Sequence, residues 1–168
     1  MIKNLNYLFV TFFGLGTVRY APGTITSLVT TILLYSFFHI INLSNYIILF
    51  FLCLIFIYSF YAVADYIKDN ENKDPKEVVI DEVIGQSIPI YLYEISHGTY
   101  KNPQEAILFY IYIFILFRLF DIKKPFPINI FDKKFKNSFG VIMDDVIAGF
   151  YVVLTLIIFM IIKSKFFI

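Results

Sequence analysis

The sequence has few charged residues, a single cysteine and no tryptophan. Charged residues make up 16% of the 168-residue chain, whereas hydrophobic residues make up 59%, and the mean hydropathy is +0.75. Soluble domains are closer to half apolar and a quarter charged, and a chain of this length cannot bury so much apolar surface in its own interior. We therefore expect an integral membrane protein, with lipid as the solvent for the surplus.

The lone cysteine and the near-neutral charge exclude several classes of protein. Cys53 can form no internal disulfide and has no second cysteine for a metal site, so we interpret it as a small apolar packing residue. A formal net charge of +1 predicts no nucleic-acid partner. Because tryptophan is missing, tyrosine is left to anchor the chain at the membrane interface.

Long apolar runs predict an all-α bundle with about four to five membrane segments. Crossing a bilayer takes roughly 20 mostly apolar residues. Residues 25–41 and 46–64 approach that length, and the short polar turn 42–45 between them predicts an antiparallel hairpin. Further apolar runs span residues 106–120 and 141–162, and a shorter fifth segment over 83–95 contains Pro89.

The N-terminal stretch and the overall layout predict one domain over residues 1–168. Residues 4–13 are too short to cross a bilayer and show no small-residue cleavage pattern, so we expect an interfacial or partly re-entrant helix rather than a secretory signal. The chain contains no solenoid repeat and no low-complexity linker that would divide it.

The basic residues predict how the bundle is oriented. Cytoplasmic loops are enriched in Lys and Arg. With five crossings, every basic residue except Lys101, Lys163 and Lys165 falls on one side of the membrane. That side also holds the two long polar connections, residues 65–81 and 123–137, which we therefore expect in the cytoplasm.

Three groups of carboxylates lie at the ends of apolar segments on that same side. Carboxylates in such places are costly, so each needs a cation, a metal ion or water. Oxygen ligands without nearby His or Cys favour magnesium or manganese, and His39 and His97 fall on the opposite side. Structural ion pairing with Arg118 and lysines is the alternative interpretation. The groups are Asp81 with Glu82, Asp121 alone, and Asp144 with Asp145.

Two further patterns are typical of phosphate binding. Arg118, Asp121 and Lys124 follow one another at intervals of three and share a helix face. A guanidinium suits bidentate capture of phosphate, and an ammonium adds a point charge. In Pro22-Gly23-Thr24, we expect Thr24 to cap the following helix, whose free N–H groups form an anion site in principle.

Four blocks of sequence together resemble a known family. They are Pro22-Gly23-Thr24 with Ser27, Ile80-Asp81-Glu82-Val-Ile-Gly85, Phe117-Arg118-Leu-Phe-Asp121-Ile-Lys-Lys124-Pro125-Phe-Pro127-Ile128, and Gly140-Val-Ile-Met143-Asp144-Asp145-Val-Ile-Ala148-Gly149. Their order and approximate spacing are similar to those of the phosphatidylglycerophosphatase A family of membrane lipid phosphatases. The sequence departs from the family at Thr26 and at residues 137–139, where glycines are usual, and these changes bear on substrate preference more than on reaction type.

The resemblance implies an enzyme of bacterial phospholipid synthesis at the inner membrane. Such an enzyme hydrolyses phosphatidylglycerophosphate to phosphatidylglycerol and inorganic phosphate, depends on Mg²⁺ and acts among membrane lipids. Together with the residue patterns, it predicts that five carboxylates form a cage for one or two Mg²⁺ ions and act in catalysis, and that four other residues bind phosphate. The cage comprises Asp81, Glu82, Asp121, Asp144 and Asp145; the phosphate-binding residues are Arg118, Lys124, Thr24 and Ser27.

Alternative functions remain open at this level. Attack by an activated water needs no covalent intermediate, whereas an aspartate nucleophile is a second route, although the pattern Asp-x-Asp-x-Thr of soluble phosphatases is missing. A different lipid phosphate is an alternative substrate. A cation or proton carrier is a non-enzymatic alternative, and it would place carboxylates near the middle of the bilayer.

Overall fold

The computed structural model describes residues 2–68, 70, 72, 75–97 and 103–166, and this part of the chain is helical and contains no strand. The all-α prediction is confirmed. The helices are α1 (Ile2–Val10), α2 (Pro22–Tyr35), α3 (Asn45–Ile67), α4 (Ile80–His97), α5 (Pro103–Lys123), α6 (Ile128–Lys134) and α7 (Ser138–Phe166), with a short helical turn η1 (Leu15–Thr17) and a π-helical end η2 (Ser36–Ile40).

Within the described part of the chain, three helices are long and apolar enough to cross a membrane. They span Pro22–Ile40, Asn45–Ile67 and Ser138–Lys165, and large apolar side chains such as Phe50 and Leu154 are exposed on them. Lipid covers such surfaces at lower free-energy cost than water. Helix α4 contains three carboxylates and does not meet the same criterion. The expected total of four to five segments stays a prediction.

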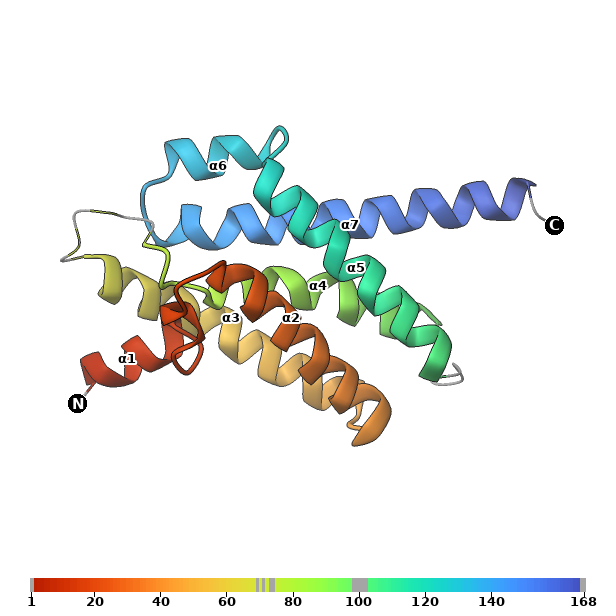
Figure 1. Ribbon diagram of the computed structural model, residues 1–168, viewed down its shortest axis with the longest axis horizontal. Coiled ribbons are helices and arrows are strands. Elements are labelled where there is room, and N and C mark those ends of the chain that lie inside the picture. The colour runs from red at the N-terminus through yellow and green to blue at the C-terminus, as the bar shows by residue number, and fades with distance from the viewer. Residues whose placement is uncertain (1, 69, 71, 73–74, 98–102, 167–168) are drawn as a thin grey trace.

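Helix α4 is the centre of the bundle. Helices α2 and α3 run in opposite directions, as the predicted hairpin requires, but each packs against α4 (Figure 1). Close approach to α7 depends on two glycines: a Cβ added to Gly85 would lie 2.6 Å from the Asp145 carbonyl oxygen, and one on Gly149 would lie 2.5 Å from the Gly85 carbonyl oxygen. Small residues at such contacts let helix backbones approach. As a result, the first turn of α4 lies beside Asp145.

The first or last turns of several helices lie together at one end of the molecule. The first turns of α2, α4 and α7 and the last turn of α5 lie toward the left of Figure 1, with α1 and α6 beside them. Helix α6 lies within the connection 123–137, for which the sequence predicted only a helix break. That break is confirmed, because α5 ends at Lys123 and Lys124 has a φ of 41°. We call this end of the bundle the acidic end.

The N-terminal helix packs on α3 and presents apolar side chains outward. Asn6 donates a hydrogen bond to Asp65 over 2.7 Å and accepts one from the Tyr58 hydroxyl over 2.6 Å. Leu5 in this helix and Phe13 just after it are largely exposed. This arrangement suits the expected interfacial position. Four residues of the predicted polar loop 65–81, Asp69, Glu71, Lys73 and Asp74, and Lys101 of the orientation argument lie outside the described residues.

Candidate metal and phosphate site

Asp81 and Glu82 lie in the first turn of α4, and the N-terminal segment fixes where that turn begins. The Val79 N–H donates to the Val10 carbonyl over 2.9 Å, and Gly16 lies so close to Glu77 that an added Cβ would be 2.0 Å from its carbonyl oxygen. Asp81 Oδ1 accepts a hydrogen bond from the Glu82 N–H over 3.1 Å. The start of α4 is thereby held against residues far away in the sequence.

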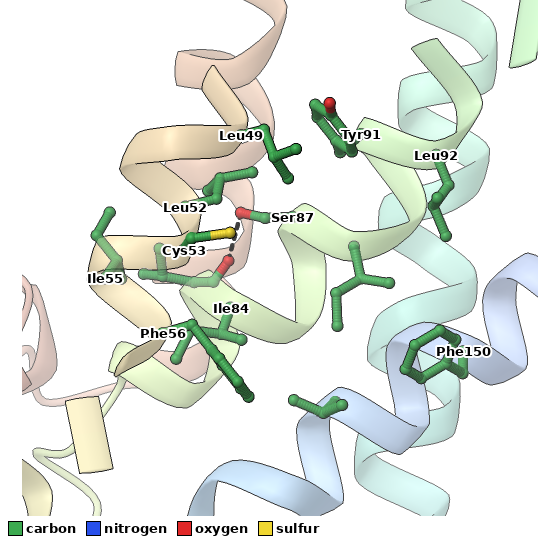
Figure 2. Close-up of a pocket in the computed structure, with 13 residues that line it drawn as sticks. Leu49, Leu52, Cys53, Ile55, Phe56, Ile84, Ser87, Tyr91, Leu92 and Phe150 are labelled. Carbon is green, nitrogen blue, oxygen red and sulfur yellow. Dashed lines mark hydrogen bonds between the residues drawn. The ribbon is translucent and has the colours of Figure 1, made fainter. Parts of the chain in front are cut away.

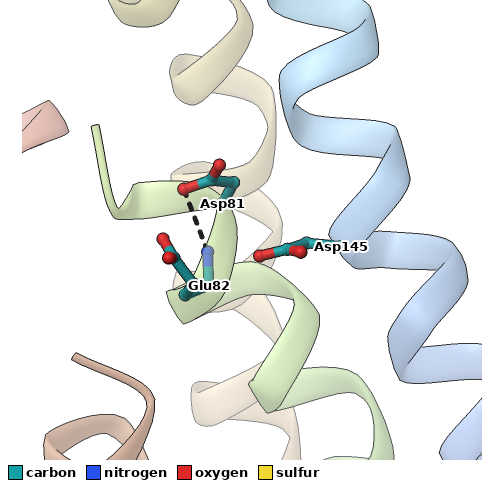
Figure 3. A group of neighbouring side chains, drawn as sticks. All are labelled: Asp81, Glu82 and Asp145. Atoms are coloured by element: carbon teal, nitrogen blue, oxygen red, sulfur yellow. Dashed lines mark hydrogen bonds between the residues drawn. The ribbon is translucent and has the colours of Figure 1, made fainter. Parts of the chain in front are cut away.

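Asp144 and Asp145 lie two turns into α7 and are almost completely buried. At the helix start, Asn137 Oδ1 accepts a hydrogen bond from the Gly140 N–H over 3.0 Å, which is the role of a capping side chain. Asp144 Oδ1 likewise accepts from the Asp145 N–H over 3.0 Å. Because α7 packs closely on α4, Asp145 points toward the α4 pair (Figure 3).

Three carboxylates form a compact cluster. One oxygen from each of Asp81, Glu82 and Asp145 lies within 4.8 Å of the others. Glu82 Oε2 is buried and has no hydrogen-bond partner among the described residues. Like charges in a low dielectric repel strongly, so such a cluster favours a cation that the three can share.

The other two predicted carboxylates have basic partners at short range. Arg118 Nη1 lies 2.6 Å from Asp121 Oδ2, and Lys124 Nζ lies 2.7 Å from Asp144 Oδ2. Arg118 Nη1 also donates to the Ser27 hydroxyl over 3.3 Å. The structural ion pairing weighed as an alternative is therefore present for Asp121 and Asp144, and it also holds both cations beside the cluster.

The N-terminus of α2 closes the site on the remaining side. Pro22, Gly23 and Thr24 line a cavity together with the clustered carboxylates. A Cβ on Gly23 would lie 1.9 Å from Glu82 Oε1 and 3.4 Å from Arg118 Nη1. A side chain at this position would therefore displace the end of Glu82, whereas the bare glycine backbone leaves it in place. The prediction that Thr24 caps this helix is wrong: α2 begins at Pro22, and the capping position is Ala21 with a φ of 46°. Proline suits the first helical position because its φ is already helical and it has no N–H to satisfy.

One cavity of about 350 Å³ collects the predicted site residues. Eight of the nine line it: Thr24, Asp81, Glu82, Arg118, Asp121, Lys124, Asp144 and Asp145. The ninth, Ser27, is buried behind it and contacts Arg118. Sequence reasoning missed Lys76, an exposed lysine that also lines the cavity. It lies in a connection rich in charge of both signs, where no pattern distinguishes it from its neighbours.

Comparison with known proteins assigns the chain to a family. A model of the family phosphatidylglycerophosphatase A matches residues 8–160. A protein of Haemophilus influenzae named phosphatidylglycerophosphatase A is 36% identical over 91% of this chain and 87% of its own length. The chain belongs to the phosphatidylglycerophosphatase A family. It is therefore an enzyme, a phosphatase.

Two other relatives mark the range of names among similar proteins. The phosphatidylglycerophosphatase A of Escherichia coli K12 is 28% identical over 88% of this chain and 79% of its own. A Bacteroides thetaiotaomicron protein, provisionally named phosphatidylinositol-3-phosphatase, is 31% identical over 88% of each chain. No solved structure matches the chain. The family assignment thus leaves more than one lipid phosphate to consider.

The residues of this cavity fit a hard divalent cation. Asp81, Glu82 and Asp145 offer only oxygen ligands, which Mg²⁺ and Mn²⁺ prefer. Glu82 Oε2, which has no hydrogen-bond partner among the described residues, also supports a cation at this position, since a buried charged oxygen is costly unless something binds it. The predicted cage of five carboxylates therefore divides into two groups. Asp81, Glu82 and Asp145 cluster together, whereas Asp121 and Asp144 pair with basic side chains.

Proposed function

We propose that this chain removes the terminal phosphate of phosphatidylglycerophosphate, with Mg²⁺, at the cytoplasmic face of the bacterial inner membrane. The observation that carries the proposal is the convergence of Asp81, Glu82 and Asp145 beside Arg118 and Lys124 in one cavity. The family and the names of the H. influenzae and E. coli relatives support this substrate. The apolar faces of α3 and α7 support a substrate delivered from lipid.

Asp81, Glu82 and Asp145 would hold the metal. Bound there, Mg²⁺ would neutralise charge on the phosphate and favour ionisation of the attacking water. In the reaction, the water oxygen forms a bond to phosphorus while the bond from phosphorus to the glycerol oxygen breaks. The leaving oxygen takes up a proton, so that phosphatidylglycerol and inorganic phosphate result.

Arg118 and Lys124 would bind the phosphate and stabilise the charge that develops on it. Arg118 is held between Asp121 and Ser27, so its guanidinium is oriented before substrate arrives. Such preorganised donors are worth more than flexible ones, because they lose little freedom when the transition state forms. Lys124 is held in the same way by Asp144. Asp121 and Asp144 therefore act as positioning residues in this proposal.

The cytoplasmic orientation rests on the distribution of basic residues. Among the described residues, three lysines lie at the acidic end of the bundle, in the last turn of α6 or just after it: Lys133, Lys134 and Lys136. Lys163 and Lys165 lie in the last turn of α7, at the other end. Cytoplasmic segments near membrane helices carry the excess of Lys and Arg. This distribution supports a site that opens toward the cytoplasm.

Phosphate release from several lipids tests the substrate. Purified protein is assayed with phosphatidylglycerophosphate, phosphatidic acid and phosphatidylinositol 3-phosphate, each with Mg²⁺ and with EDTA. We expect phosphatidylglycerophosphate to have the largest kcat/KM and EDTA to abolish turnover. A larger kcat/KM for phosphatidylinositol 3-phosphate would replace the proposed substrate with the one in the name of the Bacteroides relative. Full activity in EDTA would refute the proposed dependence on Mg²⁺.

A further inference from the structure

A second cavity lies farther along α4 than the phosphate site. It has a volume of about 380 Å³ and lies between α3, α4 and α7 (Figure 2). Its walls are almost wholly apolar, and the Ser87 hydroxyl is turned back onto the Val83 carbonyl over 2.6 Å. We call this cavity the apolar groove. Its lining residues include Leu49, Cys53, Ile84, Ile88, Leu92 and Phe150.

The apolar groove follows the same face of α4 as Asp81, a carboxylate of the site. Ile84, Ile88 and Leu92 follow Asp81 at intervals of three, seven and eleven residues, so all four lie along one face of α4. By helix rise, Leu92 is about 16 Å below Asp81. On the facing helix, the groove residue Val146 is the neighbour of Asp145 in the sequence. Polar ligands therefore head a stripe that is apolar for the rest of its length.

We propose that the apolar groove binds one acyl chain of the lipid whose phosphate occupies the site. The inference rests on the proposed lipid phosphatase function and adds where the lipid tail is held. A lipid phosphate has a charged end and an apolar end joined by a short headgroup, and this face of α4 presents the two matching surfaces in the same order. Helices α3 and α7 are candidate membrane spans, so the groove opens where acyl chains are available.

A third cavity provides a matched comparison. It has a volume of about 490 Å³ and is also apolar, but it lies between α4, α5 and α7, in the half of the bundle away from Asp81, Glu82 and Asp145. Met160 and Val153 line it, and no residue of the acidic cluster does. Bulk lipid would fill both cavities equally, whereas a substrate tail with its phosphate at Asp81 meets the apolar groove first; the two cavities share only Leu92.

The single cysteine of the chain allows a direct test, because Cys53 lines the apolar groove and is exposed. Protein in nanodiscs is treated with decyl methanethiosulfonate, which attaches a ten-carbon chain to the thiol. Phosphate release is then measured with long-chain phosphatidylglycerophosphate and with its deacylated, water-soluble headgroup. Each labelled protein is compared with its own unlabelled form. The matched control carries Cys53→Ala and Met160→Cys, which moves the same label to the third cavity.

We expect the label at Cys53 to raise KM for the lipid about threefold or more and to leave turnover of the deacylated headgroup unchanged. The effect is modest because displaced acyl chains find other lipid, so mainly packing is lost. The label at Met160→Cys should change neither. The proposal would be refuted by an unchanged KM for the lipid, which would show that bulk lipid alone fills the groove. It would also be refuted if the label at Cys53 slowed turnover of the deacylated headgroup as much as turnover of the lipid, or if the label in the third cavity raised KM equally.

A measurement without turnover separates this inference from the proposed function. The rate at which N-ethylmaleimide modifies Cys53 is measured with a phosphonate analogue of phosphatidylglycerophosphate and with phosphatidylcholine. We expect the analogue alone to slow the reaction, about threefold or more at saturation. If the unlabelled protein hydrolyses no phosphatidylglycerophosphate but the analogue still protects Cys53, the proposed activity is refuted, whereas acyl-chain binding in the apolar groove is supported. If turnover is normal and the analogue gives no protection, the groove fails alone.

Discussion

The two ends of the bundle each bury carboxylates, but they satisfy them differently. At the end opposite the acidic end, Glu94 lies 3.2 Å from His39 Nε2, and the rings of Tyr35 and Tyr110 pack against that histidine. At the acidic end, three carboxylates share one space and Glu82 Oε2 has no partner among the described residues. The first carboxylate thus has a basic side chain beside it, whereas the second arrangement would gain stability from a bound cation.

The largest effect should follow from removing one charge of the acidic cluster. In Asp145→Asn and in Asp81→Asn, the shape of the side chain is kept but a metal ligand is weakened. We expect kcat/KM for phosphate release to fall by about 10³-fold or more, because metal assistance supplies several kcal/mol. Circular dichroism should show unchanged helix content. Normal turnover in both variants would mean that the cluster is not the catalytic centre.

A large but smaller loss should follow from Arg118→Lys. Lysine keeps the charge but cannot reproduce the planar fork that contacts Asp121 and Ser27 and would bind phosphate with two bonds. We expect kcat/KM to fall about 100-fold. Arg19→Lys is the matched control, since Arg19 is exposed and stacks on Tyr20 away from the cavity. Equal activity of the two variants would contradict a role for the guanidinium geometry.

Gly23→Ala should have an intermediate effect. Its Cβ would lie 1.9 Å from Glu82 Oε1, so Glu82 must move away from the cluster. We expect about a tenfold loss of kcat/KM, since catalytic groups tolerate displacements of only a fraction of an ångström. Adding Glu82→Asp shortens the displaced side chain, and the double variant should lose less than the product of the two single losses. Strictly multiplicative losses would show that Gly23 does not act through Glu82.

The smallest effect on catalysis should come from the opposite end. His39→Ala removes the partner of Glu94 and should lower the free energy of unfolding by about 1–3 kcal/mol, seen as a lower Tm. Activity at a temperature well below Tm should stay within about twofold, because distant sites act independently. A loss comparable to that of Asp145→Asn would erase the distinction between the two ends.

Much of this comparison could be predicted from the sequence. The apolar runs predicted the helices because long stretches without polar interruption leave few alternatives in lipid. The acidic blocks predicted the site because carboxylates at the ends of such helices need partners. Residues as far apart as Asp81 and Asp145 could be grouped, since the predicted crossings brought them to one side.

The pairing within the site could not be predicted. Spacing placed Asp121 next to both Arg118 and Lys124, but it gave no sign that Lys124 also lies beside Asp144 on another helix. That contact arises because α5 ends at Lys123 and the left-handed backbone at Lys124 turns the side chain toward α7. The capping prediction for Thr24 was wrong because Pro22 starts the helix two residues earlier. Helix α6 was missed because seven residues with two lysines give too little periodicity to recognise.

Direct binding of Mn²⁺, as a substitute for Mg²⁺, tests the central claim without relying on turnover. Electron paramagnetic resonance counts free Mn²⁺ as it is titrated into the wild-type protein, Asp145→Asn and His39→Ala. We predict saturable binding by the wild-type protein and by His39→Ala, with Mg²⁺ in competition, and a dissociation constant about tenfold or more higher in Asp145→Asn. Equal affinity in Asp145→Asn and the wild-type protein would contradict the claim that the acidic end is completed by a metal ion.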